Sequence, residues 1–234
     1  MVKDKDKKLP PLPFFRVDEL LGVEEEAPEP TVINRPKREQ VEEPKKAERR
    51  VPETHFSALH AQVGPHGNLW ELTELNLVGS SEVDFSFLAL CEQLERLVLR
   101  GTAIESLDVL RGLTQLRYLD VSQTAIRSLD ALSELEQLEE LDASETEVSD
   151  LSALGGLHAL RVLTLRKTKV TEIDAVVGLP LLEKLDLKGC AIGDLNSLRK
   201  LGGSVRISLS RGTVDRFRRE QALARKHSKA KEES

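Results

Sequence analysis

Aromatic residues and long apolar runs are both scarce in this sequence of 234 residues. Six Phe, one Tyr and one Trp leave the packing of a core to Leu, Ile and Val. No apolar run approaches the roughly 18 to 20 residues that cross a bilayer, and the first residues include no apolar segment of signal-peptide length. We therefore expect a cytoplasmic protein with a repetitive aliphatic core.

Residues that carry covalent or metal chemistry are equally sparse. The two cysteines, Cys91 and Cys190, are too few for a disulfide framework, and the five His form no cluster with zinc-site spacing. A phosphate-binding loop, a dinucleotide fingerprint and a nucleophile elbow are also missing. We expect two buried thiols, no cofactor, no metal site, no small-molecule substrate and no enzymatic activity.

The formal net charge of −6 is unevenly distributed. Residues 1–50 carry twelve basic and twelve acidic side chains, and residues 1–52 hold eight of the ten prolines, which predicts a disordered segment over 1–52. Residues 216–234 have a net charge of +4, which leaves −10 on residues 51–215.

The basic C-terminal segment, residues 216–234, has several interpretations. A terminal helix is expected from Val214 to Arg225, with Val214 and Phe217 turned toward the core. The tail could bind nucleic acid or an anionic membrane, it could simply be solvated, or it could fold over the acidic centre of the concave face of its own or a neighbouring chain.

One apolar stretch interrupts the charged N-terminal segment. Residues 9–23, LPPLPFFRVDELLGV, place three prolines before a short apolar-faced helical pattern. Two hypotheses follow: the stretch docks on a partner, or it packs on its own solenoid. The candidate docking residues are Phe14, Phe15, Val17, Leu20 and Leu21.

A unit of 22 residues repeats without a gap through the middle of the chain. Apolar residues at the fourth and sixth positions predict a short strand. Ser, Asp or Asn at the fifteenth position can accept hydrogen bonds from free backbone N–H groups, so we expect a short helical turn to begin there. The ninth position is mostly Thr, whose hydroxyl can bond the backbone of the neighbouring turn. The units start at Leu72, Leu94, Leu116, Leu138, Leu160, Leu182 and, degenerately, Ser204.

The layout LxxLxLxxTxIxxLxxLxxL over about residues 69–215 resembles the leucine-rich repeat family. It is similar to the short 22-residue class of internalins and phosphatase-regulator-type repeats, with Thr in place of the usual Asn. The resemblance implies an α/β fold, a right-handed solenoid of about seven coils with a parallel concave sheet and short helical turns on the convex side. We expect an N-terminal cap at 53–71, the solenoid at 72–215 and a basic helix or tail at 216–234.

The third, fifth and seventh residues of each unit point away from the core onto the concave face. Asp120 and Asp142 fall in one column of adjacent strands, which makes the centre of this face acidic, with basic groups on both flanks. The face is either a binding surface or a passive polar surface in which the basic groups neutralise the carboxylates. The candidate partner-binding residues are Arg96, Arg100, Tyr118, Asp120, Glu140, Asp142, Arg166, Lys184, Asp186 and Lys188.

An open sheet offers no water-excluding pocket, and no His falls among these carboxylates, so we do not expect them to be catalytic. The leading hypothesis is a non-enzymatic interaction module or scaffold that binds a protein partner through its concave face. The alternative is a regulatory subunit of an enzyme such as a phosphatase. A weaker alternative assigns the function to the basic C-terminal tail.

Overall fold

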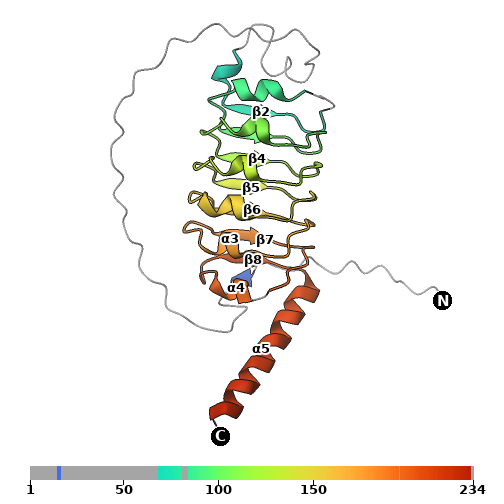
Figure 1. Ribbon diagram of the computed structural model, residues 1–234, viewed down its shortest axis with the longest axis vertical. Coiled ribbons are helices and arrows are strands. Elements are labelled where there is room, and N and C mark those ends of the chain that lie inside the picture. The colour runs from blue at the N-terminus through green and yellow to red at the C-terminus, as the bar shows by residue number, and fades with distance from the viewer. Residues whose placement is uncertain (1–14, 17–67, 81–83, 195, 233–234) are drawn as a thin grey trace, which may run out of the picture.

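Each coil of the chain contributes one three-residue strand to a common sheet (Figure 1). The computed structural model describes residues 15–16, 68–80, 84–194 and 196–232. Seven strands pair in parallel in chain order, and each register joins residues 22 apart. This confirms the α/β solenoid. The strands are β2 Glu74–Asn76, β3 Arg96–Val98, β4 Tyr118–Asp120, β5 Glu140–Asp142, β6 Val162–Thr164, β7 Lys184–Asp186 and β8 Arg206–Ser208.

The core is a stack of aliphatic side chains that repeats once per coil. The first, fourth, sixth, eleventh, fourteenth and seventeenth positions of the inner coils are almost completely buried. Full burial of one such side chain stabilises the fold by about 1.5–3 kcal/mol. The middle residue of each strand is at most 2% exposed: Leu75, Leu97, Leu119, Leu141, Leu163, Leu185 and Ile207.

A short helical turn follows each strand on the other side of the core. As predicted, the turns begin at the fifteenth position. They are η2 Ser86–Leu90, η3 Asp108–Leu110, η4 Asp130–Leu132, η5 Ser152–Gly156, α3 Asp174–Val177 and α4 Asn196–Lys200.

The predicted capping role of the fifteenth residue is wrong. The geometric N-cap is the residue before it, such as Leu151, whose side chain is buried and cannot cap. The capping oxygen comes from the thirteenth position instead: the N–H of Ser152 donates to Asp150 Oδ1 at 2.8 Å, and the N–H of Ser86 donates to Asp84 Oδ1 at 2.8 Å. Hydrogen bonds from these serines lower the pKa of both carboxyls.

The ninth-position threonines bond to the backbone of their own coil; Thr168 Oγ1 also forms a hydrogen bond with Cys190 Sγ of the next coil, at 3.3 Å. Thr124 Oγ1 donates to the carbonyl of Val121 at 2.6 Å, three residues back, and Thr102, Thr146 and Thr168 repeat the bond. The thiol of Cys190 does reach the preceding coil, where the Leu165 carbonyl accepts at 2.9 Å. Both cysteines are buried free thiols, as predicted, and burial raises the pKa of Cys91 to about 12.

Added elements close the two ends of the stack. The short helix η1 Leu69–Glu71 buries Leu69 and half-buries Trp70 at the first coil; residues 53–67 of the predicted cap lie outside the described residues. Helix α5 Arg211–Glu232 starts at the last coil, where Val214 is 4% and Phe217 1% exposed. The burial of both residues confirms that they face the core. Beyond this contact α5 projects away from the stack (Figure 1).

A two-residue strand, β1 Phe15–Arg16, lies antiparallel on the free edge of β8 (Figure 1). Its register pairs Phe15 with Ile207 and Arg16 with Arg206. The N-terminal stretch that the sequence singles out therefore meets its own solenoid at Phe15. The other candidate docking residues, Phe14, Val17, Leu20 and Leu21, lie outside the described residues.

Deleting residues 1–16 should weaken the protection of β8. Strand β8 would lose its antiparallel partner and present an unpaired edge. Hydrogen exchange measured by mass spectrometry should then be faster in peptides covering 204–210 and unchanged in peptides covering 138–144. Equal protection of 204–210 in both proteins would contradict the pairing.

The eighth residue of each of the first six coils adopts the left-handed backbone conformation. Gly79, Gly101 and Gly189 supply it at three coils, with φ of 63°, 66° and 85°, and Gln123, Glu145 and Lys167 at the others, with φ of 54° to 59°. The glycines differ in how much room a Cβ atom would have. A Cβ on Gly189 would lie 2.9 Å from Lys167 Cγ and 3.2 Å from its backbone, whereas one on Gly79 meets nothing within 4 Å.

The substitutions Gly79→Ala and Gly189→Ala form a matched pair. Both place Cβ in the left-handed region, which costs about 1–2 kcal/mol. Gly189→Ala also forces Lys167 to move, so we expect it to be worse by a further ~1 kcal/mol or more. Denaturant unfolding of the two variants measures the difference. Equal losses would show that the coils around Gly189 relax freely.

Candidate functional site

The solvent side of the seven-strand sheet carries all ten candidate partner-binding residues. We call it the sheet face; it is the concave face of the sequence analysis, formed by the third, fifth and seventh residues of each coil. Seven of the ten lie in β3, β4, β5 and β7, and Arg100, Arg166 and Lys188 follow two residues after the ends of β3, β6 and β7. Strand alternation therefore brings the predicted set onto one surface.

The centre of the sheet face is acidic, as predicted. Asp120 is the register partner of Asp142, and Tyr118 that of Glu140. Asp120 Oδ1 accepts from the Ser122 N–H at 2.9 Å and from its hydroxyl at 2.5 Å. Asp142 Oδ1 accepts from the N–H of Ser144 at 2.9 Å. Within the described residues, no cationic group forms an ion pair with Asp120, Glu140 or Asp142.

The basic residues on the flanks have other contacts. The Arg96 guanidinium lies over the Tyr118 ring at 3.5 Å from its centroid. Arg100 Nε donates to Gln123 Oε1 at 3.2 Å. Arg166 Nε is 4.0 Å from Asp186 Oδ2, and the Lys188 N–H donates to Asp186 Oδ1 at 3.0 Å. Among the described residues, a basic side chain therefore neutralises Asp186 but not the two central aspartates, Asp120 and Asp142.

Tyr118 is held in place between these two charge groups. Its ring is partly buried, and Arg96 covers one side of it. Burial raises the pKa of the Tyr118 phenol, and the negative charge of Asp120 raises it further, while Arg96 opposes both effects. The phenol therefore stays neutral and presents a fixed aromatic surface beside the carboxylates.

Two serines complete the centre of the sheet face, and the sequence analysis did not select them. Ser122 and Ser144 occupy the seventh position of adjacent coils, and their signal in the sequence is an Asp-x-Ser pattern repeated 22 residues apart. The Ser144 hydroxyl is buried and has no hydrogen-bond partner in the part of the chain that the structure describes, in a residue only 9% exposed. A buried polar group left unpaired costs about 1–3 kcal/mol.

Solved structures identify this architecture. Internalin C2 of Listeria monocytogenes matches with a TM-score of 0.57 and 28% identity over 59% of this chain. A leucine-rich-repeat protein of Leptospira interrogans matches with a TM-score of 0.55 and 27% identity over 58%, and internalin F of Listeria monocytogenes with 0.50 and 25% over 60%. This chain is a leucine-rich-repeat protein.

The likeness covers only part of each of those proteins. This leucine-rich-repeat chain spans 62% of the length of internalin C2, 48% of internalin F and 37% of the Leptospira protein. No protein-family model matches the chain, and no curated protein matches it. Its assignment to the 22-residue class of repeats stays a prediction.

Beside the sheet face, the second position of successive coils forms a column of alternating charge that the sequence analysis missed. It runs through Glu95, Arg117, Glu139, Arg161 and Glu183. Arg117 Nη1 lies 2.7 Å from Glu139 Oε1, and Arg161 Nη1 lies 2.7 Å from Glu183 Oε1. Longer contacts of 3.8 and 4.0 Å join Arg117 to Glu95 and Arg161 to Glu139. The repeat thus links five charges across five coils.

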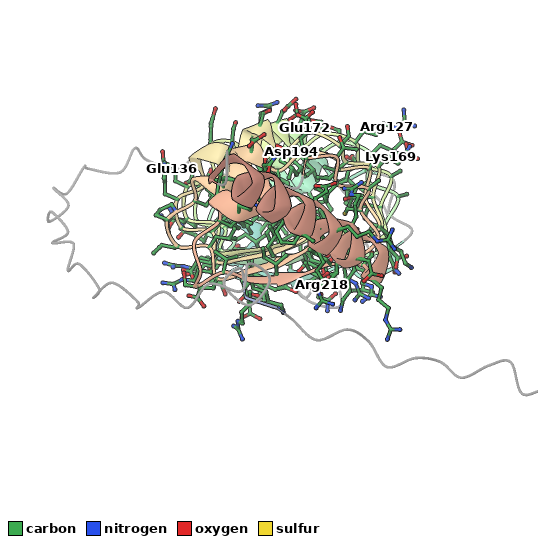
Figure 2. All side chains as sticks on the ribbon, turned by 90° about the horizontal axis from the view of Figure 1, so that it is seen from below. Arg127, Glu136, Lys169, Glu172, Asp194 and Arg218 are labelled. Carbon is green, nitrogen blue, oxygen red and sulfur yellow. The ribbon has the colours of Figure 1, made fainter. Side chains whose placement is uncertain are left out.

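A second group of charges pairs on another side of the solenoid. The Glu147 carboxylate lies 3.2 Å from Arg127 Nε and 3.3 Å from Lys169 Nζ. Glu147 and Lys169 occupy the tenth position of adjacent coils, and Arg127 occupies the twelfth position of the coil before them. Figure 2 shows Arg127 and Lys169 at one corner of the molecule, away from the labelled Arg218 of α5. Charges on neighbouring coils are therefore paired where their signs alternate, in contrast to Asp120 and Asp142.

The described part of the chain contains no group of three or more His, Cys, Asp or Glu residues that could hold a metal ion. None of the described helices is both long enough and apolar enough to span a bilayer. The chemistry available on the sheet face is that of carboxylates, hydroxyls, guanidinium and ammonium groups and one aromatic ring.

Reversing the central charge of the alternating column should destabilise the fold. Glu139→Lys replaces two attractive contacts by two repulsive ones, and we expect a loss of about 1–2 kcal/mol, since single exposed pairs are worth about 0.2–1 kcal/mol. Added salt should reduce the loss. Denaturant unfolding measures it against Glu136→Lys, an exposed position three residues earlier and outside the column (Figure 2). Equal effects of the two changes would mean that the column contributes nothing.

Proposed function

We propose that this leucine-rich-repeat chain is a non-enzymatic interaction module that binds a protein partner through its sheet face. The observation that carries the proposal is the centre of that face, where adjacent carboxylates of Asp120 and Asp142 have no cation among the described residues. Like charges so close repel each other unless a cationic group meets them. A partner that supplies this group relieves the repulsion.

The composition of the face supports the same function. Tyr and Arg are the residue types that most often anchor protein interfaces, and Tyr118 and Arg96 stand together beside the acidic centre. Because their stacking fixes both side chains before binding, little side-chain entropy is lost on association. Leucine-rich-repeat neighbours such as the internalins support a protein-interaction module in general, and the partner's identity is left to experiment.

The proposal is tested with a variant of the sheet face that preserves the fold. Tyr118→Ala, Glu140→Lys and Asp142→Lys are combined, because these side chains are at least partly exposed. Asp120 is kept, because it is only 9% exposed and accepts two hydrogen bonds from Ser122. Affinity capture from native lysate identifies partners of the unaltered chain, and calorimetry with the purified partner measures the affinities.

We expect the triple variant to bind at least 30-fold more weakly, while its thermal unfolding stays close to that of the unaltered chain. The matched control is Glu136→Lys with Glu172→Lys, two exposed charges away from the sheet face (Figure 2). Unchanged affinity in a folded triple variant would refute the proposal. If the captured partner is an enzyme, its activity with and without the chain separates regulation from tethering.

A further inference from the structure

Four side chains from two adjacent coils meet at the centre of the sheet face. We call Asp120, Ser122, Asp142 and Ser144 the Asp-Ser block. Asp120 pairs with Asp142 in the register of β4 and β5, and Gln123 N–H donates to the Ser144 carbonyl at 2.8 Å, which keeps the two coils in register one residue past Ser122. The block is therefore a fixed two-by-two arrangement of carboxylates and hydroxyls.

The hydrogen bonds inside the block leave a specific set of groups unfilled. The hydrogen bonds to the aspartates reach Oδ1, so Oδ2 of Asp120 and Oδ2 of Asp142 accept none from the described residues. The Ser122 hydroxyl donates to Asp120, whereas the equivalent Ser144 hydroxyl is buried, has no partner among the described residues and is not open to a ligand. Two carboxylate oxygens on adjacent strands are thus left unfilled.

The geometry points to a lysine side chain of the protein partner as the occupant of the Asp-Ser block. This inference rests on the proposed function and names the chemistry that it recognises. An ammonium group carries one positive charge and three donors, two of which can go to Asp120 Oδ2 and Asp142 Oδ2 while the third stays in water. Its charge also removes the repulsion between the two carboxylates.

Other cations fit less well. A guanidinium is a planar fork suited to a single carboxylate and to stacking on an aromatic ring, and Arg96 already stacks on the Tyr118 ring beside the block. A metal ion is disfavoured because no group of three or more acidic, His or Cys side chains in the described residues could hold one. The block offers two carboxylates on adjacent strands, which suits a compact ammonium.

The charges around the block limit the sequence that carries the lysine. Arg96 and Arg100 lie on the coil of β3, and Arg166, Lys184 and Lys188 lie on the coils of β6 and β7. These flanks repel a polybasic segment and attract acidic residues on either side of a single lysine. Strands spaced about 4.8 Å apart put the flanks roughly 7–12 Å from the block, or two to four residues of an extended peptide.

The probe is a synthetic peptide, acetyl-Glu-Gly-Lys-Gly-Gly-Glu-amide, added to the full chain labelled with ¹⁵N. We expect saturable amide shifts centred on Ser122 and Ser144, because both N–H groups donate to the aspartates of the block. The same peptide with its lysine acetylated should produce at least tenfold weaker binding. This comparison needs no protein variant, so it does not depend on the folding of a mutant.

Variants then test the carboxylates of the block. Asp142→Asn should weaken peptide binding at least tenfold. The controls are Ser144→Ala and Ser208→Ala, which each remove a buried hydroxyl that has no partner among the described residues, inside and outside the block. Both should leave the affinity unchanged.

The two proposals fail in different ways. Equal binding of the acetylated and unmodified peptides, or shifts centred outside the block, would overturn the lysine inference. A captured partner gives a second test. If the partner binds the triple variant of the sheet face weakly but still binds the unaltered chain after all the partner's exposed lysines are acetylated, the lysine inference is overturned and the proposed function stands. A partner indifferent to the triple variant would overturn the proposed function itself.

Discussion

The whole structure depends on the gapless 22-residue register of its coils. Each strand is only three residues long, and none has enough apolar surface to be stable alone. Stability comes from stacking: Leu119, for example, is the register partner of Leu97 on one side and Leu141 on the other, and all three are at most 1% exposed. A one-residue slip in any coil would move its leucines from the core to the solvent. The same register therefore fixes the position of every side chain on the surface.

Because of this register, charged side chains on the surface are arranged in columns that run along the stack. A residue at a given position always has the same position of the next coil as its neighbour, about 4.8 Å away. Where the sign alternates, as from Glu95 to Glu183, the column pairs internally. Where it repeats, as at Asp120 and Asp142, the stack itself cannot resolve the repulsion, because the backbone ladder holds both strands. Only a cationic group from outside the stack can relieve this repulsion, which makes this pair the candidate binding site.

The solenoid could be predicted from the sequence because the same pattern of apolar residues occurs in every coil. The strands, the start of each helical turn, the buried cysteines and the inward-facing Val214 and Phe217 follow from periodicity. The sequence was less informative where two positions carry residues of similar chemistry that could both cap the helical turn. Asp, Ser and Asn at both the thirteenth and the fifteenth positions suit a cap, and only backbone geometry selects the former. The hydroxyl of Ser144 could not be recognised as unpaired, since Ser122, at the equivalent position, is paired. The antiparallel strand β1 lies outside the repeated units, so periodicity could not predict it.

The location of the Asp-Ser block along the stack explains how two like charges are held together. Its coils lie in the middle of the solenoid, held on both sides, whereas the ends need added elements such as α5 and β1. The carbonyl of Ser144 accepts from Gln123 in the preceding coil, and the N–H of the next residue, Glu145, donates to the Arg166 carbonyl in the following one. With the backbone bonded to both neighbours, the strands that carry Asp120 and Asp142 cannot move apart. The stack thus keeps two carboxylates beside each other that a less constrained loop would separate, and their charge remains available to a ligand.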